Sequence, residues 1–274
     1  MSQASVAVRF IYARTMDVTS TQRRRLDEII KQALRIRRHL QPRLDAHGDR
    51  VHFRPSSSGI AMVGLAHHLP QRGKSGVSVA ALEHDFEAQF QLHCGGGIAA
   101  RRATPEKQLQ SFLIRESYKN ERRILPLNVA SRLTNDPVEL VFVTDEIALP
   151  VADGKRMVCD VLALRRDGAR STPVVLELKN ERMLKRLAEQ VDGYAALVDE
   201  HADLFAKLYG ALLGETVHFD GPTEKWIVWP ARDEPREGSS EKTLQANQIR
   251  VVGYRESEGA YDFDVGPSPY LRVS

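Results

Sequence analysis

Two neighbouring apolar segments of this chain each contain a carboxylate, and this pattern most limits what the chain can fold into. Asp160 lies within residues 158–164, and Glu177 lies within residues 173–179. Both segments are rich in valine and leucine and are bounded by turn residues, so each is expected to form a strand. Burying a carboxylate is costly unless the group is paired or binds a metal. We therefore expect Asp160 and Glu177 to meet at a polar site.

The alternation of side chains along a strand predicts the composition of this site. Residues two apart share a face, so Glu177 and Lys179 point the same way as Val175, and Asp160 shares a face with Leu162. If the strands pair, two carboxylates and one ammonium converge, as in a divalent-metal site with an adjacent cation. The alternative is an exposed ion pair between Glu177 and Lys179 on an edge strand, which is worth little.

The second part of the chain shows the order helix, strand, strand, strand, helix, strand. Thr104 as the N-cap and Pro105 at the first helical position predict the start of its first helix. Strands are expected over residues 138–149, 157–164, 173–179 and 225–230, helices over about 181–201 and 204–213, and edge strands over 249–254 and 261–265. This order predicts an α/β fold, with a mixed sheet flanked by helices.

These features together resemble the PD-(D/E)xK nuclease superfamily, whose members share the restriction-endonuclease-like core of order αβββαβ. The residues that carry the resemblance are Asp160, Glu177, Leu178, Lys179, Gln190 and Tyr194. Residues 190–194 are similar to the Q-x-x-x-Y helix of the RecB-type branch. The resemblance covers about residues 104–230. It departs from the family name at Cys159, where that name places a proline before the aspartate.

The resemblance implies a nuclease that depends on Mg²⁺ or Mn²⁺ and hydrolyses phosphodiester bonds, with DNA favoured over RNA as the substrate. Asp160 and Glu177 would hold the metal together with the backbone carbonyl of Leu178, since these ions prefer oxygen ligands. Lys179 would orient or deprotonate the attacking water, or would stabilise charge on the phosphoryl oxygens. These two roles of Lys179 cannot be separated from the sequence.

Further site residues are expected on the two helices. Gln190 and Tyr194 lie four residues apart and share a helix face. By the resemblance Gln190 reaches toward the site, and Tyr194 contacts substrate or orients a ligand, with ordinary packing as the alternative for Tyr194. Glu106 is the favoured acid of the first helix, although an acid in the first turn complements the helix dipole whatever its function. Glu116 is its competitor.

Charge divides the chain into a basic first part and an acidic second part. Residues 1–104 contain 16 lysines and arginines against 8 acidic residues, a net charge of +8, and the remainder contains 23 against 28, a net charge of −5. This division indicates an anion-binding arm beside a metal-binding core. A solvated basic face without a partner is the equally weighted alternative.

The boundary between the two parts is expected between Gly95 and Thr104, where three consecutive glycines break the pattern. It would separate an N-terminal α+β accessory domain, residues 1–100, from a nuclease-like domain, residues 104–274. Strands are expected in the first part over 6–12 and 86–93, and a hairpin over 51–54 and 59–65.

Basic side chains in both parts are candidates for binding nucleic acid. They are Arg23, Arg24, Arg25, Arg35, Arg37 and Arg38 on a helix expected to begin near Ser20, and Arg182, Lys185 and Arg186 just after the acidic site. The alternative for the N-terminal part is a homodimer formed through Leu26, Ile30 and Leu34. The rival functions are therefore a nucleic-acid-binding protein that cuts nothing and a dimerising α/β protein without a nucleic-acid ligand.

The remaining sequence features limit the setting of the protein. Cys94 and Cys159 are too few for a disulfide framework or a cysteine-based zinc site. No apolar run approaches the roughly 20 residues of a membrane span, and the N-terminus lacks the features of a signal peptide. A cytoplasmic protein without a membrane partner is expected.

Overall fold

The computed structural model describes residues 3–48, 50–65, 76–94, 104–130, 138–180, 187–231, 244, 246–257 and 260–264. Its helices are α1 (Gln3–Arg35), α2 (Gln41–His47), α3 (Val79–His84), α4 (Phe86–His93), α5 (Pro105–Lys119), α6 (Leu125–Ala130), α7 (Leu187–Glu200) and α8 (Ala202–Leu213). A π-helical segment, η1 (Ile36–Leu40), joins α1 to α2, and a short 3-10 helix, η2 (Ala152–Gly154), follows β3. The strands are β1 (Val51–Ser56), β2 (Gly59–Gly64), β3 (Val138–Pro150), β4 (Arg156–Asp167), β5 (Arg170–Leu178), β6 (Glu224–Pro230), β7 (Ile249–Ser257) and β8 (Ala260–Asp264).

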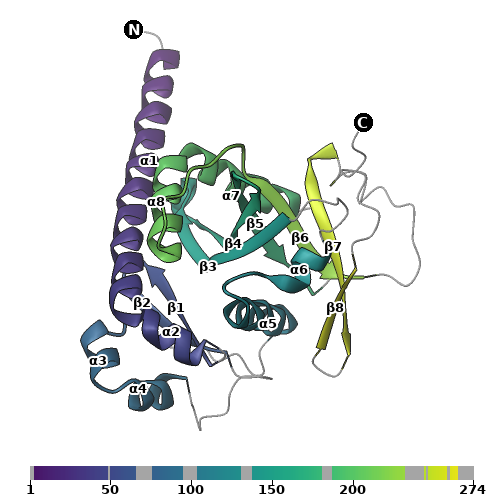
Figure 1. The fold of residues 1–274 in the computed structure, drawn as a ribbon. Coiled ribbons are helices and arrows are strands. Elements are labelled where there is room, and N and C mark those ends of the chain that lie inside the picture. Colours follow the sequence, from purple (N-terminus) through teal and green to yellow (C-terminus); the bar gives the residue numbers. More distant parts are fainter. Residues whose placement is uncertain are drawn as a thin grey trace.

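A mixed sheet of order β3-β4-β5-β6-β7-β8 forms the centre of the molecule (Figure 1). The strands β3, β4 and β5 form an antiparallel meander, and β6 and β7 continue the sheet in parallel to β5. A parallel neighbour needs a crossover connection, and here α7 and α8 supply it between β5 and β6. The predicted α/β class with a mixed sheet is thus confirmed.

Helices cover both faces of this sheet (Figure 1). One hydrophobic cluster joins α7, α8 and the middle of α1 to one face, and a second joins α5 and α6 to the other. The predicted start of α5 is confirmed, since the Thr104 side chain accepts a hydrogen bond from the Lys107 amide at 3.4 Å. Trp229 is buried in the first cluster, and Trp226 in the second.

The N-terminal part combines a two-stranded hairpin with helices. The predicted hairpin is confirmed as β1 and β2, with Val51 opposite Gly64. A third hydrophobic cluster packs η1 and α2 to α4 on this hairpin. The long helix α1 also lies along α8, and its Leu26, Ile29 and Ala33 belong to the cluster on the main sheet. The apolar core therefore continues across the predicted domain boundary.

Two predicted strands are wrong, because both segments are helical. Residues 86–93 form α4, where Asp85 caps the helix by accepting from the Ala88 amide at 3.0 Å. Phe86 and Phe90 lie four residues apart and stack on one another, whereas Leu92 is 70% exposed, so helical spacing decides which face is buried. Residues 6–12 lie within α1. Among the described helices none has the length and apolar character needed to cross a membrane.

Candidate functional site

Asp160 and Glu177 come together where β4 and β5 separate. The antiparallel pairing of these strands begins with Val161 opposite Leu176, so the next residue on each strand brings Asp160 level with Glu177. At this position the amide of Leu178 donates a hydrogen bond to Asp160 Oδ2 at 3.0 Å. The Asp160 carboxylate thus accepts a hydrogen bond that a backbone carbonyl of β4 would otherwise accept, and β4 and β5 separate beside it.

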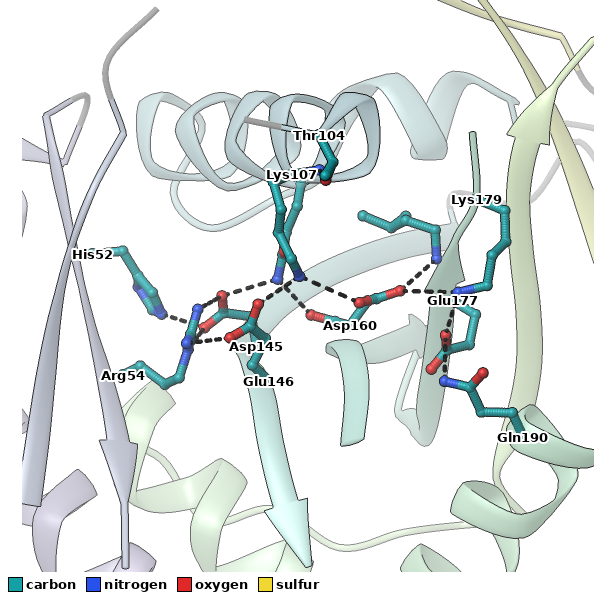
Figure 2. A network of polar contacts seen from close by, with 12 residues as sticks. His52, Arg54, Thr104, Lys107, Asp145, Glu146, Asp160, Glu177, Lys179 and Gln190 are labelled. Atoms are coloured by element: carbon teal, nitrogen blue, oxygen red, sulfur yellow. Dashed lines mark hydrogen bonds and ion pairs between the residues drawn. The ribbon is translucent and has the colours of Figure 1, made fainter. Parts of the chain in front are cut away.

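One ammonium connects the two carboxylates (Figure 2). Lys179 Nζ lies 3.1 Å from Glu177 Oε2 and 3.8 Å from Asp160 Oδ2. Gln190, on α7, donates from Nε2 to the same Glu177 oxygen at 3.0 Å. The structure therefore brings together four of the residues that the sequence predicts for the site.

Burial and mutual repulsion set the electrostatics of this group. The Glu177 side chain is fully buried. Burial, and then the charge on Asp160, raises the pKa of Glu177 to about 8, although Lys179 opposes the shift. Burial lowers the pKa of Lys179, but the charges of Glu177 and Asp160 outweigh it and the net shift is upward. The Glu177 carboxyl is therefore mostly protonated at neutral pH, whereas the ammonium of Lys179 stays charged.

The oxygen atoms of this group decide whether it can hold a divalent cation. Glu177 Oε1 is buried and has no hydrogen-bond partner among the described residues, so this oxygen has unused capacity as an acceptor. It lies on the carboxylate that faces Asp160, and two carboxylates with a backbone carbonyl suit Mg²⁺. Within the described ranges, no group of three or more His, Cys, Asp or Glu side chains is arranged to hold a metal. Asp160 and Glu177 are thus the two acidic groups that the site offers to a cation, and water or substrate would have to complete its ligands.

The helix α5 supports Asp160 from the other face of the sheet. Gln110 donates from Nε2 to the backbone carbonyl of Asp160 at 2.9 Å. Lys107 Nζ lies 3.6 Å from Asp160 Oδ1 and also forms an ion pair with Glu146, on β3. Lys107 and Gln110 were not predicted from the sequence, because a lysine and a glutamine on a helix give no signal of which strand residue they will reach.

The structure also distinguishes the remaining predicted residues. The charge of Glu106 contributes to the raised pKa of Lys179, which places it near the site, whereas Glu116 pairs with Lys119 at 2.9 Å. Tyr194 is fully buried, and its hydroxyl donates to the carbonyl of Ile147 at 2.9 Å. Tyr194 therefore performs the packing role that the sequence left open as its alternative.

The predicted nucleic-acid contacts occupy different surroundings. Arg23 pairs with Asp203 on α8, Arg35 bonds to Gln32 within α1, and Arg37 lies against Gly214. Arg24 and Arg38 are exposed, and Arg25 is half-buried. Arg182, Lys185 and Arg186 lie outside the described residues. Of the dimer candidates, Leu26 and Ile30 pack within the chain, and Leu34 is 52% exposed.

A second polar cluster joins the hairpin to β3, next to Lys107 (Figure 2). Asp145 is buried and accepts hydrogen bonds from His52 Nε2 at 2.8 Å, from Arg54 Nε at 2.7 Å and from Gln110 Nε2 at 3.0 Å. The Arg54 guanidinium also forms ion pairs with both Asp145 and Glu146. We refer to His52, Arg54, Asp145 and Glu146 as the hairpin network. Its signal in the sequence is the acidic pair that interrupts the apolar run at 140–149.

Hydrogen bonding assigns the protonation state of His52. Burial lowers the pKa of His52 despite the neighbouring Asp145. Burial also raises the pKa of Tyr118 to about 12, so its hydroxyl is a donor, and it lies 2.6 Å from His52 Nδ1. His52 is then a neutral ring that accepts from Tyr118 at Nδ1 and donates to Asp145 from Nε2. Arg54 supplies the positive charge that Asp145 requires.

Comparisons with protein-family models, with curated proteins and with solved structures found no match to this chain. Its function is therefore inferred from the geometry of its own residues.

Proposed function

We propose that the protein is a metal-dependent nuclease that hydrolyses phosphodiester bonds, built on a restriction-endonuclease-like core. The observation that carries the proposal is the convergence of Asp160 and Glu177 on the ammonium of Lys179, with one buried Glu177 oxygen left without a donor among the described residues. The element order α5, β3, β4, β5, α7, β6 agrees with that core, with α6 inserted before β3 and α8 before β6.

The residues that would hold Mg²⁺ or Mn²⁺ are Asp160 and Glu177, with the carbonyl of Leu178. The ion would supply Lewis-acid polarisation of a phosphoryl oxygen. Gln190 fixes the orientation of Glu177, and the amide of Leu178 fixes that of Asp160. Carboxyl groups held in this way lose little conformational freedom when a cation binds, which favours binding.

Lys179 would act on the nucleophile or on developing charge. The Lys179 side chain is 22% exposed, so a substrate can reach its ammonium. The two carboxylates hold this ammonium in place. Its raised pKa keeps it protonated near neutral pH. A protonated lysine orients water by hydrogen bonding and stabilises negative charge on the phosphoryl group, and this is the role that we assign to it.

DNA is the substrate that the family resemblance favours. The test is cleavage of single-stranded, double-stranded and branched DNA, and of RNA, by the full-length protein with Mg²⁺, Mn²⁺ or EDTA. We expect metal-dependent cleavage that is lost in Asp160→Asn and Glu177→Gln. Glu116→Gln is the matched control, because this acid pairs with Lys119 on α5 and should leave cleavage unchanged.

The same assay separates the rival functions. Binding of DNA without cleavage under any metal condition would favour a binding protein that kept the fold. Neither binding nor cleavage would favour an α/β protein without a nucleic-acid ligand. Cleavage that persists in both Asp160→Asn and Glu177→Gln would refute the assignment of the site.

A further inference from the structure

A pocket with a volume of about 350 Å³ lies between α1, the turn of the β1–β2 hairpin and the β3–β4 edge of the sheet. Three arginines from three different elements line it: Arg25 of α1, Arg54 of β1 and Arg156 of β4. Ser57 and Ser58 of the hairpin turn line it as well. Only the folded chain brings these arginines together. Arg156 was not predicted from the sequence.

The charge of this pocket is not cancelled by its own residues. Glu146 is an acid in its wall, but it pairs with both Arg54 and Lys107. Among the described residues, neither Arg25 nor Arg156 has an ion pair or a side-chain hydrogen bond. Two guanidinium groups therefore remain available to an anion, and their planar donors match the oxygens of a phosphate.

Lys107 connects the wall of the pocket to the candidate catalytic site. Lys107 Nζ contacts pocket-lining Glu146 on one side and lies 3.6 Å from Asp160 Oδ1 on the other. Along β4, Arg156 and Asp160 are four residues apart, so both lie on one face of the strand. Between them Val158 is 37% exposed, beside its strand partner Ala148. An extended ligand at Asp160 would thus pass over β4 to reach Arg156.

The backbone of Glu146 is constrained at the junction between the pocket and the site. Glu146 has a φ of 44°, in the left-handed region that residues other than glycine seldom occupy. Such a conformation costs free energy and persists only where the surroundings hold it, as the ion pairs with Arg54 and Lys107 do here. The constrained residue lies between the pocket and the site.

We propose that Arg25 and Arg156 bind the phosphodiester backbone of a nucleic acid, one or more nucleotides away from the phosphate at Asp160 and Glu177. The proposal rests on the proposed function in naming nucleic acid as the ligand. In this proposal, α1 and the main sheet together line the path of the substrate. Arg25 and Arg156 contact the sugar–phosphate chain, so they contribute affinity that does not depend on base sequence.

The test measures binding of fluorescently labelled single-stranded and duplex DNA by the full-length protein in EDTA, over a series of salt concentrations. Arg25→Gln and Arg156→Gln should each weaken binding and reduce the slope of log K against log salt on duplex DNA by about 0.9, the value for one phosphate contact. Arg170→Gln is the matched control, because Arg170 is exposed at the start of β5 and lies outside the pocket. Arg156→Lys should retain most of the slope.

The outcomes of this test separate the pocket from the nuclease proposal. Binding and slopes equal to those of Arg170→Gln would overturn the pocket, while metal-dependent cleavage by the wild type would leave the nuclease standing. Binding that depends on Arg25 and Arg156, without any cleavage, would support the pocket and refute the nuclease. If the wild type binds pyrophosphate through these arginines but no DNA or RNA, a nucleic-acid ligand is overturned. With cleavage present, Arg156→Gln should raise KM and leave kcat unchanged.

Discussion

Asp145 and Glu177 are both buried acids in strands of one sheet, yet their surroundings give them opposite properties. Asp145 accepts hydrogen bonds from His52, Arg54 and Gln110, and the charge of Arg54 overcomes the effect of burial and holds its pKa well below the usual range. At Glu177 burial prevails and the pKa is raised to about 8.

Burial of a carboxylate therefore does not by itself indicate function. Asp145 has its acceptor capacity filled by donors from β1 and α5, as expected of a residue that joins parts of a fold. Glu177 receives both of its hydrogen bonds on Oε2, and Oε1 has no donor among the residues described. Unused acceptor capacity beside a second carboxylate is what a cation site needs.

The largest expected effect separates the two acids by activity. Glu177→Gln should lower metal-dependent cleavage by at least roughly a hundredfold, the scale for removing one group that stabilises transition-state charge. It should leave the unfolding free energy unchanged or higher, because it removes a buried carboxylate that is only half satisfied. Asp160→Asn should lose cleavage and keep DNA binding equal or tighter. Single-turnover cleavage, DNA affinity and denaturant unfolding measure the three quantities.

Two results would contradict this difference between Glu177 and Asp145. A Glu177→Gln protein that fails to fold, together with a wild type that cuts no nucleic acid, would give Glu177 the structural role assigned here to Asp145. A folded Glu177→Gln protein with wild-type cleavage would remove Glu177 from the site.

For stability we expect the opposite order, because substitutions in the hairpin network should be more destabilising than Glu177→Gln. Arg54→Met leaves Asp145 buried without its main cation, and breaking a buried ion pair on one side costs about 3–5 kcal/mol. Arg23→Met is the matched control, because the side chains of Arg23 and Asp203 are 48% and 52% exposed. Such an exposed pair is worth about 0–1 kcal/mol. Equal losses in urea unfolding would show that the hairpin network does not join the hairpin to the sheet.

The pKa of Asp145 predicts how stability depends on pH. Its folded pKa is depressed, so its contribution is fully present above the unfolded value of about 3.9 and is lost as pH falls below that value toward the folded pKa. Each proton taken up on unfolding gives a slope of about 1.4 kcal/mol per pH unit. Asp145→Asn should be less stable at pH 7 and have a flatter dependence between about pH 4 and 2, as measured by chemical unfolding. An unchanged slope would contradict the assignment.

The same two regions mark how far the sequence could predict this structure. Asp160, Glu177 and Lys179 lie within 20 residues of one another on adjacent strands, so strand alternation and antiparallel pairing suffice to bring them together. Periodicity and turn residues also predicted α5, the strands β3 to β6 and the helices α7 and α8 in order, whereas α6 was not predicted. Gln190 was predicted through the family resemblance, because α7 is the next described helix after β5.

The hairpin network could not be predicted, because it depends on packing between distant segments. His52 and Arg54 meet Asp145 across about 90 residues of chain, and nothing in the local pattern selects this pairing. The pocket arginines meet in the same way, since Arg25 and Arg156 belong to elements that only the tertiary fold brings together. The segment now seen as α4 was mispredicted because its short alternating pattern also satisfies helical spacing, and tertiary packing decides between the two.

The smallest expected effect concerns two neighbours on α7 that the sequence treated alike. Tyr194→Phe removes the hydrogen bond to the Ile147 carbonyl and should lower the unfolding free energy by about 1 kcal/mol without changing metal-dependent cleavage. Gln190→Leu removes a donor to Glu177 and should lower cleavage, with little change in binding of DNA. Denaturant unfolding and single-turnover cleavage of both variants measure the difference. If Tyr194→Phe instead loses cleavage at unchanged stability, the tyrosine hydroxyl reaches substrate, and the packing role given to it by the structure is refuted.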